Sequence, residues 1–473
     1  MPIKRFNFLA AVLSLGLPPA SATPEEGSGT AAETPPDTIT WDDGIAALIR
    51  RHCIECHRPG QSAPFALLRH SDVAARGGFL VEAVESGHMP PWLPERGGHA
   101  FIGQRGLSAE EIDRLRAWVQ AGAPAGRNGG EPIPEPETDS RWQLGEPDII
   151  LRMEEAFEIP AANRDIYRAF VLSFDADSFP ADLVRAARIP GSDVVGVSAV
   201  EVRPGNRRTV HHALVFVDST GTARRLAAAD TEPGYERFGD PGFEPSGFLG
   251  AYTPGSTPGR WPPGIADTLD LHGDIVLHMH YSPTGKTETD RTEIGIHLSR
   301  EPVRRVTAPV RLGSFDLEIP PGAERHRVSD RFRLPADVFV LALTPHMHYL
   351  GRKVRVRART PGGTEETLLE IRRWNFNWQD RYRLEEPVYL PAGTVVSAEW
   401  VFDNSADNPS NPSDPPRHVT FGPDSTDEMA EVHLDCIPLE PDDYGVLTEA
   451  MENAVRDAVR RLTPEQRKRY GFQ

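Results

Sequence analysis

Histidine pairs recur along this chain, and a methionine follows the last of them. His211 and His212 are adjacent, whereas one residue separates the members of each later pair. Copper changes between two oxidation states and accepts both imidazole and thioether ligands, so a set of this kind suits it. The other members are His278 with His280, His346 with His348, and Met429 in the sequence Asp427-Glu-Met429.

A β-strand would place these pairs in different ways. Side chains two residues apart share one face of a strand, so His278 and His280 could bind one ion together. Spacing alone does not choose between them. Adjacent side chains point to opposite faces, so His211 and His212 need a bend, a bulge or a strand end before they can share a metal.

A second redox motif lies upstream, in Cys53-Ile-Glu-Cys56-His57. Two cysteines three residues apart can attach a c-type haem covalently, and the next histidine then binds the iron. The alternative is a zinc site, which would need further nearby ligands. Candidates for those ligands are His52, His70, His88 and His99.

The sixth ligand of this haem is predicted to be Met89, which heads the sequence Met89-Pro-Pro-Trp92. Pro90 and Pro91 would stiffen the loop that presents the thioether. The neighbouring His88 is the alternative ligand. A thioether raises the haem potential relative to a second imidazole. A haem and a copper site on one chain imply electron flow toward oxygen chemistry.

Length and charge limit the possible classes of protein. The chain has 473 residues, which corresponds to about three domains. Its 51 basic and 69 acidic residues give a net charge of -18. Such a charge argues against binding to nucleic acids or anionic membranes. With three cysteines, two of them in the haem motif, Cys436 is predicted to be a small buried apolar residue.

The first 22 residues are predicted to be an export signal. Lys4 and Arg5 precede an apolar run, and Ala20-Ser-Ala22 offers a small-residue cleavage site. The apolar run is too short to span a bilayer, and no later segment is predicted to span one. We therefore expect a periplasmic or secreted protein.

A small all-α domain is predicted over residues 40–126, after a flexible linker at 23–39. Ile45, Leu48 and Ile49 share a helical face, a second helix is expected from Ser71 to Ser86, and Ser108-Ala-Glu-Glu111 forms a capping box. The domain resembles bacterial cytochrome c. That resemblance rests on Cys53 to Gly60, Met89-Pro-Pro-Trp92 and the closing stretch from Leu115 to Pro124.

Short β-rich runs alternate with Pro/Gly turns after a linker at residues 127–141, a texture typical of β-sandwiches. Roughly 300 residues of this kind exceed one sandwich, so two are expected, at 142–305 and 306–440. A helical tail is expected at 441–473. The clearest runs are Val210 to Val217, Asp274 to Tyr281, Val338 to Leu343 and Val395 to Phe402.

The histidine-bearing segments resemble the copper type II, ascorbate-dependent monooxygenases, the group of peptidylglycine α-hydroxylating monooxygenase and dopamine β-monooxygenase. The resemblance covers roughly residues 142 to 440, and the segments occur in the family's order. They are Val210-His-His-Ala-Leu-Val-Phe216, Met279-His280-Tyr281, His346-Met-His348-Tyr-Leu-Gly-Arg-Lys-Val354 and Asp427-Glu-Met429.

This resemblance implies two copper ions at a cleft between two jelly-roll-like sandwiches. His211, His212 and His280 correspond to the ligands of an electron-accepting copper, because the third ligand there precedes a tyrosine. His278 would then lie outside the ligand set. The ligands of the catalytic copper, at which oxygen reacts and one electron arrives from the first copper, correspond to His346, His348 and Met429.

The sequence departs from the family pattern at positions near the catalytic ligands. Thr344 replaces the arginine that holds a substrate carboxylate in the peptide-hydroxylating members, which argues against a peptidyl-glycine substrate. His433 replaces a tyrosine, and Glu431 replaces an uncharged residue. The carboxylate of Glu431 could bind the amino group of an amine substrate.

Taken together, these features predict an exported copper-dependent monooxygenase that hydroxylates a small organic substrate with O2. Electrons would come from an external donor, either a redox carrier or an ascorbate-like reductant, and pass through the fused haem domain. One alternative is a non-catalytic haem and copper electron-transfer or copper-binding protein. Another is a protein that stores or delivers copper, with exposed and flexible metal groups.

Overall fold

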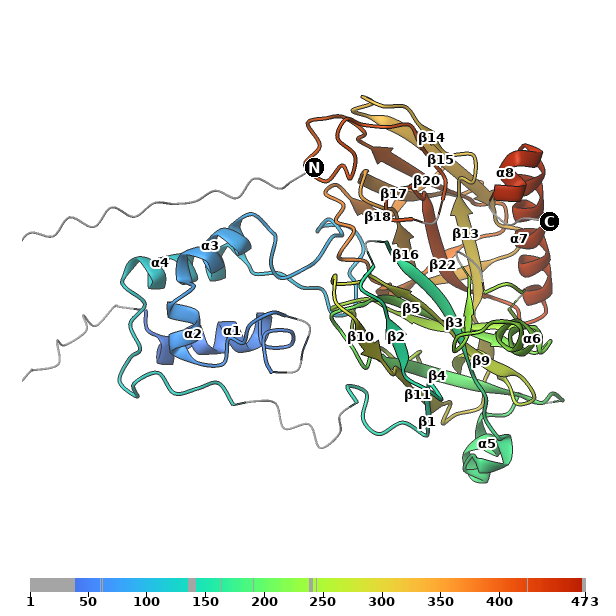
Figure 1. Ribbon diagram of the computed structural model, residues 1–473, viewed down its shortest axis with the longest axis horizontal. Helices are drawn as coiled ribbons and strands as arrows, with labels where there is room; N and C mark the ends of the chain where they lie inside the picture. Colours follow the sequence, from blue (N-terminus) through green and yellow to red (C-terminus); the bar gives the residue numbers. More distant parts are fainter. Residues whose placement is uncertain are drawn as a thin grey trace, which may run out of the picture. The chain divides into compact units, whose positions relative to one another are not determined.

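The computed structural model describes residues 39–59, 61, 63–134, 142–162, 164–189, 191–237, 241–243, 245–422 and 424–469. The predicted export signal lies outside these residues, as do nearly all of the first linker and the end of the second. Strands dominate the described chain and helices are few, which confirms the prediction of a β-rich protein (Figure 1). The proposed domain boundaries stay predictions.

The N-terminal helices are held together by an apolar core that contains Ile45, Leu48 and Ile49, the residues predicted to share a helical face. The capping box is confirmed: Ser108 accepts a hydrogen bond from the Glu111 backbone, and the Glu111 side chain accepts one from Ser108 N–H. The helical elements are a π-helix at Trp41–Ile45, α1 at Ala46–His52, α2 at His70–Ala74, α3 at Gly77–Glu85 and α4 at Ala109–Gln120.

The single helix expected from Ser71 to Ser86 is wrong, because α2 and α3 are separate helices. Their junction precedes Gly77 and Gly78, and glycine is a poor helix former. Gly77 also lies against α4, where a Cβ atom would come within 2.9 Å of a Val119 methyl group. Gly77 therefore allows α3 to pack closely on α4, and the same glycine disfavours one continuous helix through this position.

Part of the segment between α3 and α4 packs against the C-terminal strands instead of the N-terminal helices. Leu93 and Phe101 are buried in the core of the C-terminal strands. Phe101 forms a β-bridge with Leu384, and Glu95 N–H donates to the Glu370 carbonyl at 2.8 Å. Part of the predicted haem domain is thus built into the β-rich region.

Two sheets form the first β-region, and one apolar cluster joins their facing sides. Strands pair antiparallel except that β12 runs parallel to β8. Within the described residues, one sheet has the order β1 (Ile149–Arg152), β11 (Glu293–Leu298), β4 (Val194–Arg203), β8 (Ile265–Asp270), β12 (Arg305–Val306), and the other β6 (Tyr235–Glu236), β3 (Ile166–Leu172), β9 (Asp274–Tyr281), β5 (Val210–Asp218), β7 (Gly247–Tyr252).

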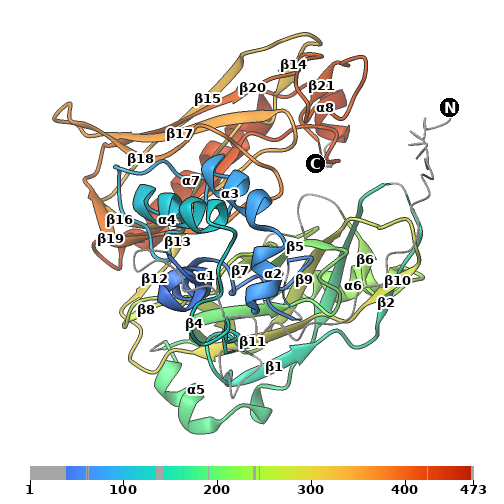
Figure 2. The same ribbon diagram turned by 90° about the vertical axis from the view of Figure 1, so that its left-hand side faces the viewer.

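Two further sheets enclose the core of the second β-region. In Figure 2, β13 and β16 lie between the outer strands β15 and β20 and the strands β5 and β9 of the first region. The sheets have the orders β13 (Ala308–Gly313), β22 (Glu431–Pro438), β16 (Val338–His346), β19 (Tyr382–Leu390) and β15 (His326–Arg333), β20 (Val395–Phe402), β17 (Gly351–Arg359), β18 (Glu365–Ile371).

A long C-terminal helix and several shorter elements complete the fold. The apolar face of α7 packs on the second β-region through residues such as Met451 and Val455, and Figure 1 shows this helix beside β13. These elements are β2 (Phe157–Ile159) with β10 (Glu288–Asp290), β14 (Glu318–Ile319) with β21 (Val419–Thr420), a 3-10 turn (Ala176–Ser178), α5 (Ala181–Ala187), α6 (Thr222–Ala229), α7 (Asp443–Arg460) and α8 (Pro464–Arg469).

Alternation along β9 decides where its histidines point. Leu277, Met279 and Tyr281 enter the core between the first two sheets, so His278 and His280 lie on the opposite face. Cys436, on β22, is buried in the second core, as predicted. No helix among the described residues is long and apolar enough to cross a membrane.

Candidate metal centre

A β-bulge brings His211 and His212 to the same side of β5. The register with β9 shifts between Val210 and His212, so that Val210 pairs with Tyr281 and His212 pairs with His280. One extra residue in a strand changes the direction of the side chains around it. The bulge is one of the irregularities that the sequence required before these neighbours could share a metal.

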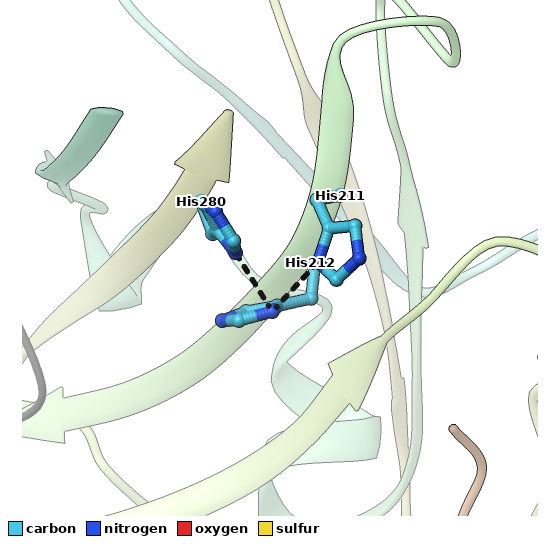
Figure 3. Close-up of side chains that lie close together, drawn as sticks. All are labelled: His211, His212 and His280. Carbon is cyan, nitrogen blue, oxygen red and sulfur yellow. Dashed lines mark hydrogen bonds between the residues drawn. The ribbon is translucent and has the colours of Figure 1, made fainter. Parts of the chain in front are cut away.

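The three imidazoles of His211, His212 and His280 converge (Figure 3). His212 Nδ1 lies 3.4 Å from His211 Nδ1 and 3.3 Å from His280 Nδ1. One ring nitrogen from each residue lies within 4.8 Å of the other two. Three nitrogens each about 2.0–2.1 Å from a metal ion would be separated by up to about 4 Å. The histidine triad could therefore hold a metal ion with little movement.

Burial keeps the imidazoles of His211 and His212 in the form that binds metals. Removal from water lowers the pKa of His211 to about 3, and the neighbouring His280 adds to this effect. Burial likewise lowers the pKa of His212 well below its ordinary value. Both rings are neutral near pH 7, and neutral imidazole is the ligand form of histidine.

His280 is held on two sides. The Tyr167 ring stacks on it at 4.2 Å, with an interplanar angle of 19°. Asp165 Oδ2 lies 3.3 Å from His280 Nε2, at ion-pair distance but not aligned as a hydrogen bond. Burial works to raise the pKa of Asp165, but His280 and the hydroxyls of Ser425 and Ser282 outweigh it and hold that pKa low.

His278 has a different environment although it shares a strand face with His280. Its Nε2–H donates to the Arg237 carbonyl at 2.9 Å, and its ring lies 6.4 Å from that of Phe216. It is not a member of the converging triad. The structure thus brings His280 to the adjacent pair and places His278 elsewhere on the same sheet.

The second histidine pair lies where β16 ends. His346 closes the strand, His348 follows it, and their ring centroids are 5.1 Å apart. His348 Nδ1 donates to the Asp427 carbonyl at 3.1 Å, and His346 Nδ1 lies 2.6 Å from Gln379 Oε1. Because carbonyl oxygens only accept, each Nδ1 carries the proton. Each Nε2 is therefore left with a lone pair that a metal could use.

Glu428 ties Met429 to this pair. The buried carboxylate accepts hydrogen bonds from the backbone N–H groups of His348 at 2.9 Å, Leu350 at 2.6 Å and Met429 at 3.1 Å. Burial raises the pKa of Glu428 to about 8, although these N–H groups act in the opposite direction. Met429 is 9% exposed. One acid thus fixes the backbone at both proposed ligand segments.

Phe376 lies between the two histidine groups. Its ring stacks on His211 at 4.7 Å and meets His348 edge-on at 5.6 Å. Gln379, which contacts His346, also donates to the Phe376 carbonyl at 2.9 Å. One short segment of the second β-region therefore touches ligand candidates of both groups.

Glu431 already has a strong partner. It pairs with His346 in the register of β22 and β16, and it forms a short ion pair with Arg311. Burial works to raise the pKa of Glu431, but the charge of Arg311 and the contact with His433 hold it low. A role for Glu431 in meeting a substrate amine would have to compete with Arg311.

The Cys53–His57 segment forms one tight turn after α1. His57 N–H donates to the Cys53 carbonyl at 2.9 Å, and His57 Nδ1 donates to the Phe65 carbonyl at 3.0 Å. The Nδ1 contact leaves Nε2 for a ligand, and a carbonyl in this place orients an imidazole that binds iron. Both thiols are half-buried.

Met89 and His88 lie in the segment that joins the C-terminal strands. The His88 side chain is exposed and rests on Trp378, with ring centroids 4.6 Å apart. Met89 is half-buried, and its N–H donates to the Ala83 carbonyl at 2.9 Å. The His57 ring, by comparison, packs against the Phe65 ring, with centroids 4.7 Å apart, whereas the His88 ring packs against Trp378.

Several residues around these groups carried no signal in the sequence. Asp165, Tyr167, Phe376 and Gln379 stand in segments without a motif, and their roles depend on strands that are distant in the chain. Glu428 lies inside the Asp427-Glu-Met429 motif, where a buried acid beside a ligand candidate could have been noticed.

Comparison with known proteins gives one distant relative. The chain is 22% identical over 217 residues to DBH-like monooxygenase protein 1 of Gallus gallus. The match covers 41% of this chain and 35% of the relative, so the chain spans about a third of that protein's length. No protein-family model matches the chain.

Solved structures resemble the chain only slightly. A structure of infectious bursal disease virus Gx strain has 8% identity and a TM-score of 0.15, covering 62% of this chain and 81% of that one. Paenibacillus xanthan lyase has 11% identity and a TM-score of 0.15, covering 66% and 29%. At these TM-scores the likeness carries no argument about fold or function.

Proposed function

We propose that this chain is a copper-dependent monooxygenase acting on a small organic substrate with O2. The observation that carries the proposal is the convergence of His211, His212 and His280 on one point. Similarity to a protein named as a monooxygenase supports an oxidoreductase. The proposed fold consists of a cytochrome c-like all-α domain and two jelly-roll-like sandwich domains with the boundaries predicted above, except that the segment containing Leu93 and Phe101 packs with the second sandwich.

The donor atoms fit two copper ions of different character. Copper bound at these groups would supply one-electron chemistry, since it changes between two oxidation states. His211, His212 and His280 would offer their Nδ1 atoms to the electron-accepting ion. His346 and His348 would offer Nε2 atoms, and Met429 a thioether, to the catalytic ion, and the Phe376 ring would lie between the two groups, in contact with His211 and His348.

We further propose that Cys53 and Cys56 hold a c-type haem, with His57 and Met89 as its iron ligands. The Nδ1 contact of His57 with a carbonyl supports this assignment. The haem would accept electrons from an external redox carrier or an ascorbate-like reductant, in the periplasm or outside the cell. Met89 is favoured over His88 because it is the less exposed of the two.

Replacing both Cys53 and Cys56 with alanine is expected to abolish covalent haem attachment, because no thiol then remains to form a thioether. The measurement is haem staining of the mature protein on a denaturing gel. Cys436→Ala is the matched control and should keep its band, since that thiol is buried in a β-sheet core. A stained band in the double variant would contradict the haem assignment.

The test of the whole proposal combines metal content with oxygen uptake. Purified protein should contain two copper ions per chain, consistent with one all-histidine set and one set that includes a thioether. It should consume O2 with a reductant and a member of a panel of small amines, amides and thioethers. Copper binding without substrate-dependent uptake would favour the electron-transfer or copper-binding alternative.

A further inference from the structure

Asp165 lies where the first β-region meets the turn that leads to Met429. It directly precedes β3, whose residue Tyr167 pairs with His280 of β9. Its Oδ1 accepts a hydrogen bond from Ser282 Oγ at 3.1 Å, and its Oδ2 lies 3.3 Å from His280 Nε2. The carboxylate is thus fixed beside one member of the histidine triad.

The same Asp165 oxygen also binds the turn that leads to Met429. Ser425 Oγ donates to Asp165 Oδ2 at 2.6 Å, although the two residues are 260 positions apart in the chain. Ser425 belongs to the turn that ends in Met429, and the Asp427 carbonyl of that turn accepts from His348 Nδ1 at 3.1 Å. A single carboxylate therefore touches His280 and the turn that orients His348 and Met429.

A carboxylate beside one ring nitrogen favours the tautomer that carries its proton on that nitrogen. For His280 the proton would stay on Nε2, and the Nδ1 lone pair would face His212. The stacked Tyr167 ring fixes the plane of the imidazole but cannot choose between its two nitrogens. Asp165 is the neighbour that makes this choice.

We propose that Asp165 is a positioning residue that presents His280 Nδ1 to copper and holds the Met429 turn against the same histidine group. This inference rests on the copper assignment made above. The hydroxyls of Ser282 and Ser425 donate hydrogen bonds to its two oxygens, and His280 Nε2 lies 3.3 Å from Oδ2. An asparagine has one acceptor oxygen, and its amide N–H2 would face at least one of these donors.

The test is the dissociation constant of copper(II), measured by competition with a chelator in the full-length protein. Asp165→Ala should weaken both ions, because it removes the contact with His280 and the contact with the Met429 turn, and each loss should be roughly 10–100-fold, the usual effect of removing a partner of a metal ligand. Its copper(II) electron paramagnetic resonance signal should also change. Asp165→Asn should do the same to a smaller extent, and it keeps the volume of the side chain should the alanine variant fail to fold.

Two further variants separate the contacts of Asp165. Asp424→Asn removes an exposed carboxylate from the same turn and should keep both dissociation constants at their wild-type values. Ser425→Ala should leave copper at the histidine triad unchanged but weaken the ion held by His348 and Met429. Wild-type binding of both ions in Asp165→Ala and Asp165→Asn would overturn the proposal.

Copper binding by His280→Ala, measured in the same way, separates the copper assignment from the positioning role of Asp165. If His280→Ala binds copper as the wild type does, the copper assignment itself is wrong. If His280→Ala loses an ion while both Asp165 variants bind normally, the copper assignment stands and only the positioning role is wrong.

Discussion

Replacing His280 with alanine is expected to remove one of the two proposed copper ions, whereas replacing His278 with alanine should leave both. Of these two histidines, only His280 belongs to the converging triad, and its Nδ1 lies 3.3 Å from His212 Nδ1. Loss of a direct ligand should exceed the roughly 10–100-fold loss of affinity that removal of an outer partner causes. The measurement is copper per chain at ordinary loading, by elemental analysis.

His278→Ala is a close control because both histidines are buried on the same face of β9. The His278 variant loses a hydrogen bond to the Arg237 carbonyl, so thermal melting should accompany the copper measurement. If His278→Ala loses an ion and His280→Ala keeps both, the ligand role belongs to His278 and the correspondence with the copper monooxygenases fails at this position.

Replacing Met429 with isoleucine is expected to abolish oxygenase activity while copper stays bound at His211, His212 and His280. The thioether is the soft ligand of the proposed catalytic ion, and isoleucine offers no donor atom. Activity should fall by at least about 100-fold, the upper end of the effect of losing an outer partner. Apolar exchanges of similar volume usually cost less than about 1.5 kcal/mol of stability, so the fold should persist.

Met279→Ile provides the comparison for this variant. Met279 stands between His278 and His280 in β9, but its side chain enters the core on the opposite face of the sheet. The same thioether is lost there without contact with a histidine group, so activity should remain close to that of the wild type. Full activity in Met429→Ile, measured as the rate of product formation at a fixed protein concentration, would mean that Met429 serves only as a core residue.

The sequence predicted those parts of the site that depend on local rules. The two-residue spacing of His278 and His280 requires a shared strand face, and β9 shows it. The adjacent pair at His211 required an irregular strand, and the register shift of β5 provides one. The capping box at Ser108 likewise follows from neighbours in the chain.

What the sequence could not predict are contacts made between distant segments. No local pattern marks Phe376 as the ring between His211 and His348, because its position depends on how the two β-regions meet. Asp165 and Ser425 are polar residues in loops, and most such residues face solvent. The two glycines at 77 and 78 were a local sign of the break, but the close approach of Gly77 to Val119 on α4 is a contact between distant segments.

The segment that runs from Met89 toward α4 limits how far the chain can be treated as separable modules. Leu93 and Phe101 are 9% and 3% exposed and fill the core of the C-terminal strands. Cutting the chain at the linker near residue 127 would remove both side chains and leave cavities in that core, at a cost of several kcal/mol. An engineered exchange of the proposed haem domain should therefore retain the stretch around Leu93 and Phe101 with the strands.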